Sequence, residues 1–287
     1  MDWILEQPQE KNYYLNIREF ASGQFEATMN LVKPMSEERT RAIVDGLPVV
    51  PPCDKPLRFT KLTEEEQVAK EQANHNRAVR RARQNIRWLC KAMEVDRLLT
   101  LTYRENMEDR EQVRLHFQKF LRLVRAQEPE WKYVAVLEKQ ERGAFHIHCA
   151  VKGYQRISFI RKCWYQALGG TGEEVKEQTP GQVDVTSPKK RWGSGIKDWK
   201  TEKLAGYLTK YLAKTFDETA KEKRRYWAAK GIETPEVRRI WVGGSNMFEA
   251  IQSCLSTLEL DCGLTGVDFD WWLSSKMDCL WISGRAE

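Results

Sequence analysis

The chain has 287 residues, of which 41% are hydrophobic and 31% are charged, and its formal net charge is +6. This composition predicts a globular protein with one large core or two smaller ones, and it excludes a chain that is disordered throughout. The basic residues cluster, which favours a polyanionic partner, while seven cysteines without a CxxC pair argue against a zinc finger and indicate a reducing compartment.

Residues 1–95 are expected to form an N-terminal extension that is partly helical and either recognises DNA or completes the core. The opening, MDWILEQPQEKNYYL, has acids where a signal peptide needs bases, and no apolar run approaches the roughly 18 residues that a membrane span needs. We therefore expect a cytoplasmic protein without a membrane partner. A short helix is expected around residues 35–45, and the prolines of residues 47–56 then prevent a regular helix.

A long helix is predicted from Thr63 to about Met93. Thr63 and Glu66 form a capping-box pattern, which marks the start of a helix. Arg80 and Arg81 belong to a group of arginines that either contacts DNA phosphates or forms a solvated face favoured by the helix dipole. The apolar residues at helical spacing are Val68, Val79, Ala82, Ile86, Leu89 and Met93.

The next segments alternate between strand and helix patterns. Residues 97–103, RLLTLTY, alternate as in a strand, and residues 107–126 return to helical spacing before Pro129. Residues 157–168 predict another helix, and residues 182–187, QVDVTS, predict another short strand. With the hairpin that lies between them, this order predicts an α+β domain built on a central, mainly antiparallel β-sheet with flanking helices.

Residues 131–152, WKYVAVLEKQERGAFHIHCAVK, predict a β-hairpin that could hold a metal ion. Gly143 lies where the turn is expected. Side chains alternate along a strand, so His146 and His148 share one face, and Glu138 on the partner strand could point towards both imidazoles. Alternatively, these are ordinary polar residues on the solvated side of a sheet, and the motif alone does not decide between the two.

A helix is predicted at about residues 202–216, EKLAGYLTKYLAKTF, with one apolar and one reactive face. Tyr207, Lys210, Tyr211 and Lys214 share the reactive face, roughly 150° from the apolar residues. Burying two lysines would be costly, so we expect this face to be open. Neighbouring ammonium groups favour the phenolate form of tyrosine, which attacks phosphorus, and lysines can also bind a phosphodiester.

The loop at residues 188–200, PKKRWGSGIKDWK, combines the basic and aromatic residues that neutralise a nucleic-acid backbone and stack on bases. A solvated basic loop with its tryptophans in the core fits this sequence equally well. Residues 245–287 are expected to form a C-terminal segment with a helix and an aromatic tail. The candidate DNA contacts in the loop are Lys189, Lys190, Arg191 and Trp192.

Three motifs, LLTLTY, FHIHCAV and YLTKYLAK, occur in this order between about residues 97 and 242. Together they resemble the HUH endonucleases that initiate rolling-circle replication, and they look most like the two-tyrosine phage and plasmid initiators of the bacteriophage gpA type. The resemblance implies that residues 96–244 form a catalytic domain with a ferredoxin-like (RRM-like) core.

The resemblance also implies roles for the candidate site residues. His146 and His148 match the family's metal-binding histidines, and Glu138 fits the upstream acidic position better than Glu141, which sits in the turn. Two imidazoles and a carboxylate leave coordination positions open, which suits Mg²⁺ or Mn²⁺. The matching nucleophiles are Tyr207 and Tyr211, beside lysines common in that motif, Lys210 and Lys214.

The implied function is that of a replication initiator, a metal-dependent endonuclease that nicks and rejoins DNA. A tyrosine, with Tyr207 preferred, would attack single-stranded DNA at an origin and leave a 5′-phosphotyrosine and a free 3′-hydroxyl, which starts and later terminates rolling-circle replication of a phage or plasmid. The expected partners are single-stranded and duplex origin DNA. A separate host helicase and a polymerase are also expected, because the chain contains no GxxxxGK[ST] motif.

Three other functions stay open at this point. A two-tyrosine single-strand DNA transposase would use the same active site and differ in its DNA substrate. An iron oxygenase would use two histidines and a carboxylate without the tyrosines, and it would depend on oxygen or 2-oxoglutarate. A non-enzymatic DNA-binding replication regulator would form no covalent adduct with DNA.

Overall fold

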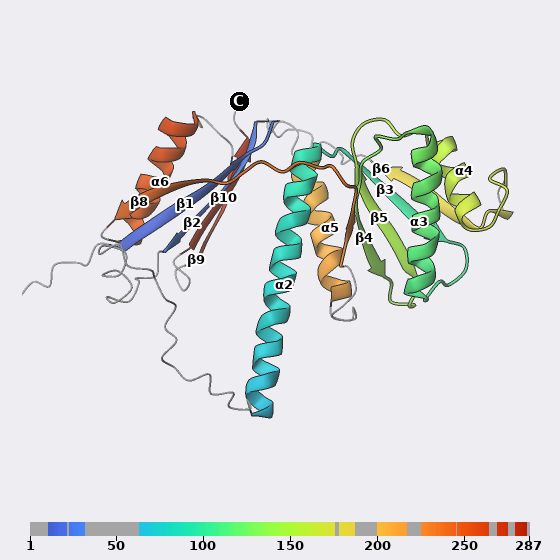
Figure 1. Ribbon diagram of the computed structural model, residues 1–287, viewed down its shortest axis with the longest axis horizontal. Helices are drawn as coiled ribbons and strands as arrows, with labels where there is room; N and C mark the ends of the chain where they lie inside the picture. Colours follow the sequence, from blue (N-terminus) through green and yellow to red (C-terminus); the bar gives the residue numbers. More distant parts are fainter. Residues whose placement is uncertain are drawn as a thin grey trace, which may run out of the picture. The chain divides into compact units, whose positions relative to one another are not determined.

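The computed structural model is an α+β protein whose described residues form two antiparallel five-stranded sheets and five helices (Figure 1). This confirms the predicted fold class, with two sheets in place of one. The chain divides into two compact units, one made of Met1–Glu19, Gly23–Ala73 and Glu236–Glu287, the other of Phe20–Ser22 and Asn74–Pro235. The structure describes residues 11–21, 23–31, 63–175, 178–186, 200–216, 225–244, 246–263, 269–274 and 279–285.

The first unit is a sheet formed by segments from both ends of the chain, in the order β8-β1-β2-β10-β9. Tyr13, Leu15 and Ile17 alternate along β1 and are buried in the core that α6 covers, because every second side chain of a strand faces the same side. Asn246 caps the start of α6, and Gly263 ends it in the left-handed conformation. The bounds are β1 Lys11–Glu19, β2 Gln24–Leu31, β8 Arg238–Gly244, α6 Met247–Cys262, β9 Phe269–Ser274 and β10 Cys279–Arg285.

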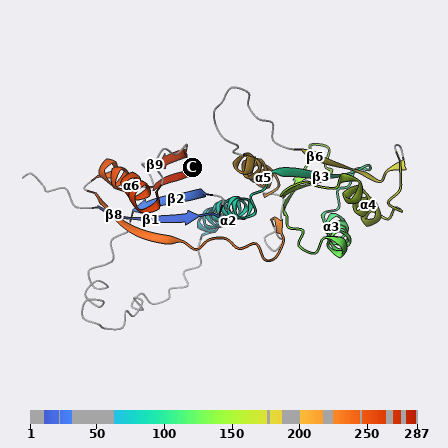
Figure 2. The ribbon, with the colours of Figure 1, turned by 90° about the horizontal axis from the view of Figure 1, so that it is seen from above.

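The second unit is a sheet in the order β6-β3-β5-β4-β7, with helices on both faces. Helices α3 and α4 lie together on one side of it (Figure 2), and α5 and the C-terminal half of α2 pack on the other. The bounds are α2 Glu64–Met93, β3 Arg97–Tyr103, α3 Arg110–Gln127, β4 Val134–Lys139, β5 Phe145–Val151, α4 Ile157–Ala167, β6 Gly181–Thr186, α5 Lys200–Phe216 and β7 Trp227–Ala228.

The register of this sheet decides which side chains face α5. Glu138 pairs with His146 across the β4–β5 hairpin, and His148 pairs with Thr100 on β3. Residues paired in register point to the same face of a sheet. The neighbouring Ile147 is buried in the core on the α3 face. The polar side chains of the hairpin therefore lie on the face that α5 covers.

Helix α2 begins as predicted but buries less of its length than predicted. The Thr63 hydroxyl accepts from the backbone N–H of Glu66 at 3.2 Å, and the Glu66 carboxylate accepts from the backbone N–H of Thr63 at 3.0 Å, so the capping box is formed. Ala82 and Ile86 are buried. The placement of Val68 in the apolar stripe was wrong, because its side chain is 68% exposed and the core under α2 starts about three turns further on.

Some expectations concern parts of the chain that are not described or not placed in a sheet by the sequence. The helix expected at residues 35–45 lies outside the described residues. The expected aromatic tail consists of strands, with Trp272 in β9 paired to Trp281 in β10. Among the residues that the structure describes, no helix combines the length and the apolar character needed to cross a membrane.

Candidate metal and tyrosine site

A tight turn between β4 and β5 sets the hairpin register. The backbone N–H of Gln140 donates to the carbonyl of Ala144 at 2.9 Å, and that of Gly143 donates to the carbonyl of Gln140 at 2.8 Å. Gly143 has φ 92°, a conformation that residues with a Cβ rarely adopt. This turn, predicted from the glycine, places Glu138 directly across from His146.

Glu138, His146 and His148 converge on one point of the α5 face. One ligand atom from each residue lies within 4.8 Å of the others, and among the described residues they form the one such group of acidic, histidine or cysteine side chains. The Nε2 atom of His148 lies 2.7 Å from Oε2 of Glu138. Two imidazoles and a carboxylate are a donor set for a divalent cation, so the residues present fit a metal. Glu141 lies in the exposed turn, outside this group.

Both imidazoles are held in the neutral form that a metal ligand needs. Burial lowers the pKa of His148, although its hydrogen bond to Glu138 opposes the shift. Burial and the nearby His148 lower the pKa of His146, with an opposing effect of Glu138 and a further lowering by Arg142. At neutral pH each ring therefore keeps a nitrogen lone pair for coordination.

Neighbouring side chains hold the second nitrogen of each ring. Nδ1 of His148 lies 3.2 Å from the hydroxyl of Thr100, and Nδ1 of His146 lies 3.1 Å from the amide of Gln140. The guanidinium of Arg142 donates to Gln140 Oε1 at 3.0 Å, which fixes that amide in turn. Sequence reasoning missed Thr100 and Gln140. The alternation of RLLTLTY placed Thr100 on a known face but gave no sign of which strand it would pair with.

Replacing Thr100 with valine is expected to weaken binding of Mn²⁺ by roughly 10- to 100-fold. Valine keeps the shape of threonine but cannot hold Nδ1 of His148, and loss of such an outer contact typically costs this much affinity. Isothermal titration calorimetry would measure the dissociation constant. Thr186→Val, an exposed position on the neighbouring strand β6, is the matched control, and equal affinities in the two variants would contradict the assigned role of Thr100.

Helix α5 brings two tyrosines onto the histidines. Its apolar side, including Leu208 and Leu212, is buried against the sheet as predicted. The ring of Tyr211 stacks on that of His148 at 4.8 Å between centroids, and the ring of Tyr207 meets His148 edge-on at 5.6 Å. The two tyrosine rings are 4.6 Å apart. The predicted metal group and the predicted nucleophiles therefore form one site.

The expectation that lysines favour the phenolate is wrong for Tyr207. Its pKa is raised, first by burial, then by a hydrogen bond with Tyr211 and by the negative charges of ionised Tyr211 and of Glu138. The side chain of Lys210 is exposed, and that of Lys214 lies outside the described residues. At neutral pH Tyr207 is therefore a neutral phenol in the metal-free protein.

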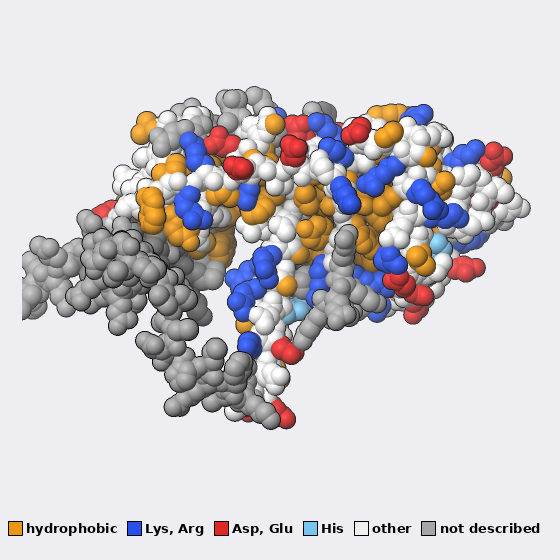
Figure 3. Space-filling model, viewed as in Figure 1, with side chains coloured by type: hydrophobic (Ala, Val, Ile, Leu, Met, Phe, Trp, Pro, Cys, Tyr) orange, Lys and Arg blue, Asp and Glu red, His pale blue; other side chains and the backbone are white. Residues whose placement is uncertain are grey.

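The predicted DNA contacts do not join this group. Arg80 and Arg81 are exposed on α2, where Figure 3 shows basic side chains gathered. The loop positions lie outside the described residues; these are Lys189, Lys190, Arg191 and Trp192.

One family model matches this chain. Residues 96–216 match a family of replication-associated proteins of the ORF2 type. The matched segment starts just before β3 and ends with α5, so it contains the histidines, Glu138 and both tyrosines. No curated protein and no solved structure gives a match. The family match supports a replication-associated protein.

Proposed function

We propose, from this family match and the geometry of the site, that the protein is a rolling-circle replication initiator of the two-tyrosine HUH type. It nicks and rejoins single-stranded DNA at an origin of a phage or plasmid. The observation that carries the proposal is the contact of one ring, His148, with a carboxylate on one side and both tyrosines on the other. Metal ligands and nucleophiles that share a single imidazole must act on the same phosphate.

Glu138, His146 and His148 would hold Mg²⁺ or Mn²⁺. These ions keep open positions when only three protein ligands bind them, which leaves room for phosphate oxygens. When bound, such an ion polarises the phosphate as a Lewis acid. The protein contributes rigid ligands, because the hairpin turn sets the register, and the contacts to Thr100 and Gln140 fix the rings.

The covalent step exchanges one phosphate ester for another. The hydroxyl oxygen of Tyr207 attacks phosphorus, the bond from phosphorus to the 3′ oxygen breaks, and that oxygen leaves as a 3′-hydroxyl after taking up a proton. Tyr207 starts as a phenol and must lose its proton as the new bond forms, and its hydrogen-bond partner is Tyr211. Rejoining reverses the same exchange without an external energy source.

Two nucleophiles allow a second cut before the first end is released. Tyr207 and Tyr211 lie one helical turn apart on α5, and both contact His148. One tyrosine keeps its DNA end while the other cuts the regenerated origin, and the free 3′-hydroxyl then resolves the first link. Unwinding and synthesis are assigned to a separate host helicase and polymerase.

Incubation of the protein with labelled single-stranded DNA of mixed sequence is expected to give a covalent adduct in Mn²⁺ that survives denaturation. EDTA should abolish the adduct, and excess Mn²⁺ should restore it. His148→Ala removes a ligand and should reduce the yield to background. An undiminished adduct in EDTA, or none on any sequence of the pool, would refute a metal-dependent nicking enzyme and favour a non-enzymatic DNA-binding regulator.

A further inference from the structure

A second polar cavity lies in the same unit, on the face of the sheet opposite the tyrosines. It has a volume of about 610 Å³ and lies between α3 and the short edge strand β7. Its floor belongs to the core on the α3 face, whereas the histidines face α5. Figure 3 shows basic side chains around an apolar hollow beside α3. The cavity is therefore separate from the candidate metal and tyrosine site.

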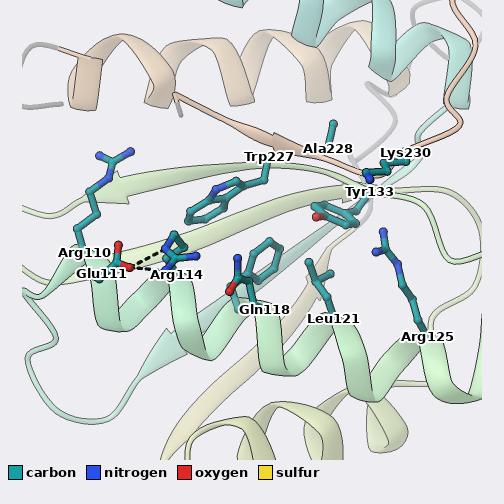
Figure 4. A pocket seen from close by; sticks show the side chains of 11 residues that line it. Arg110, Glu111, Arg114, Gln118, Leu121, Arg125, Tyr133, Trp227, Ala228 and Lys230 are labelled. Atoms are coloured by element: carbon teal, nitrogen blue, oxygen red, sulfur yellow. Dashed lines mark hydrogen bonds and ion pairs between the residues drawn. The ribbon is translucent and has the colours of Figure 1, made fainter. Parts of the chain in front are cut away.

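Aromatic rings form the floor of this cavity. Trp227 stacks on Phe117 with 5.1 Å between centroids and 30° between planes, and Tyr133 meets Phe117 edge-on at 5.4 Å. Trp227 is only half-buried, and Figure 4 shows Trp227 and Tyr133 pointing into the space above α3. Partly open aromatic rings are the surfaces on which nucleic-acid bases stack, whatever their sequence.

Basic side chains surround these rings. Four basic residues and one acidic residue line the cavity, and the acid, Glu111, accepts from the guanidinium of Arg114 at 2.8 Å. Arg110 stands at the same end as this pair, while Arg125 and Lys230 stand at the end near Tyr133 (Figure 4). The cations at the two ends suit phosphates on either side of a stacked base.

The arginines at one end also repel each other. Burial lowers the pKa of Arg110, and the charge of nearby Arg225 lowers it further. A bound anion would relieve this repulsion. An acidic peptide could supply the charge, but it would leave the aromatic floor without a flat partner, so the combination favours nucleotides.

We propose that this cavity between α3 and β7 binds a segment of single-stranded DNA, with a base on Trp227 and its neighbouring phosphates on Arg125 and Lys230. The choice of DNA as the nucleic acid rests on the proposed function, but the binding needs neither the metal nor the tyrosines. A strand held here stays on the protein independently of the covalent link.

Fluorescence anisotropy with a labelled oligo(dT), in EDTA and in the Tyr207→Phe, Tyr211→Phe background, tests binding apart from nicking. Arg125→Ala with Lys230→Ala is expected to weaken binding about 10-fold and to reduce the slope of log K against log salt by about 1.4, since each phosphate contact on a single strand contributes about 0.7. Trp227→Leu should weaken binding roughly 5- to 100-fold, the effect of losing one stacked base.

The matched control removes two charges from the same unit outside the cavity. Lys119 and Arg161 are exposed on α3 and α4, so Lys119→Ala with Arg161→Ala changes the net charge equally. Equal affinity and equal salt slope in the two double variants would overturn the proposal. Photo-crosslinking of the unmodified protein to an oligonucleotide with 5-iododeoxyuridine provides a test without mutation. Crosslinks on the peptide that contains Trp227 support the site, and crosslinks confined to other peptides refute it.

Discussion

Replacing both Tyr207 and Tyr211 with phenylalanine is expected to abolish the covalent adduct with single-stranded DNA and to leave metal binding intact. Phenylalanine keeps the ring that packs on His148 but lacks the hydroxyl that attacks phosphorus. Adduct formation should fall by roughly 10⁴-fold or more, the scale on which loss of a covalent nucleophile is felt in other enzymes. Denaturing gels would measure the adduct, and calorimetry would measure Mn²⁺ binding.

The single variants separate the two hydroxyls. Tyr207→Phe and Tyr211→Phe each retain one nucleophile, so each should still form an adduct, whereas neither should support both a first and a second cut on one DNA molecule. Tyr154→Phe is the matched control, because this tyrosine of the same unit is 85% exposed and lies outside the group around His148. An adduct of normal yield in the double variant would show that neither tyrosine is the nucleophile.

The local parts of this site could be predicted from the sequence because short periods determine them. Alternation along β5 places His146 and His148 on one face, and helical spacing along α5 places Tyr207 and Tyr211 together. The glycine of the hairpin turn is at a position that requires a positive φ, so Gly143 also indicated the register.

Long-range contacts account for what the sequence did not predict. No local pattern indicates that β1 pairs with β8, or that β2 pairs with β10, although these pairs join the two ends of the chain in one sheet. The pKa of Tyr207 has the same origin. Helical spacing correctly put lysines near it in sequence, but the packing of α5 on β4 and β5 buries its hydroxyl and brings it close to Glu138.

The position of α5, and hence of both tyrosines, depends on a buried ion pair at its first turn. Nζ of Lys91, at the end of α2, lies 2.6 Å from Oε1 of Glu202 on α5, and the lysine side chain is 0% exposed against 18% for the glutamate. The hydroxyl of Thr201 donates to the carbonyl of Val95 at 3.0 Å beside this pair. The two charges are therefore unequal in their access to water, and their removal should have unequal effects.

Glu202→Ala is expected to cost about 3–5 kcal/mol of unfolding free energy, because the fully buried ammonium of Lys91 loses this carboxylate. Lys91→Met should cost less, since methionine fills the space and the partly exposed carboxylate can reach solvent, and the two changes together should recover much of the loss. Urea unfolding measures the cost, and hydrogen exchange in residues 200–212 localises it. Lys203→Ala, an exposed neighbour on α5, should cost under about 0.5 kcal/mol, and a similar small cost for Glu202→Ala would mean that the pair does not anchor the tyrosine helix.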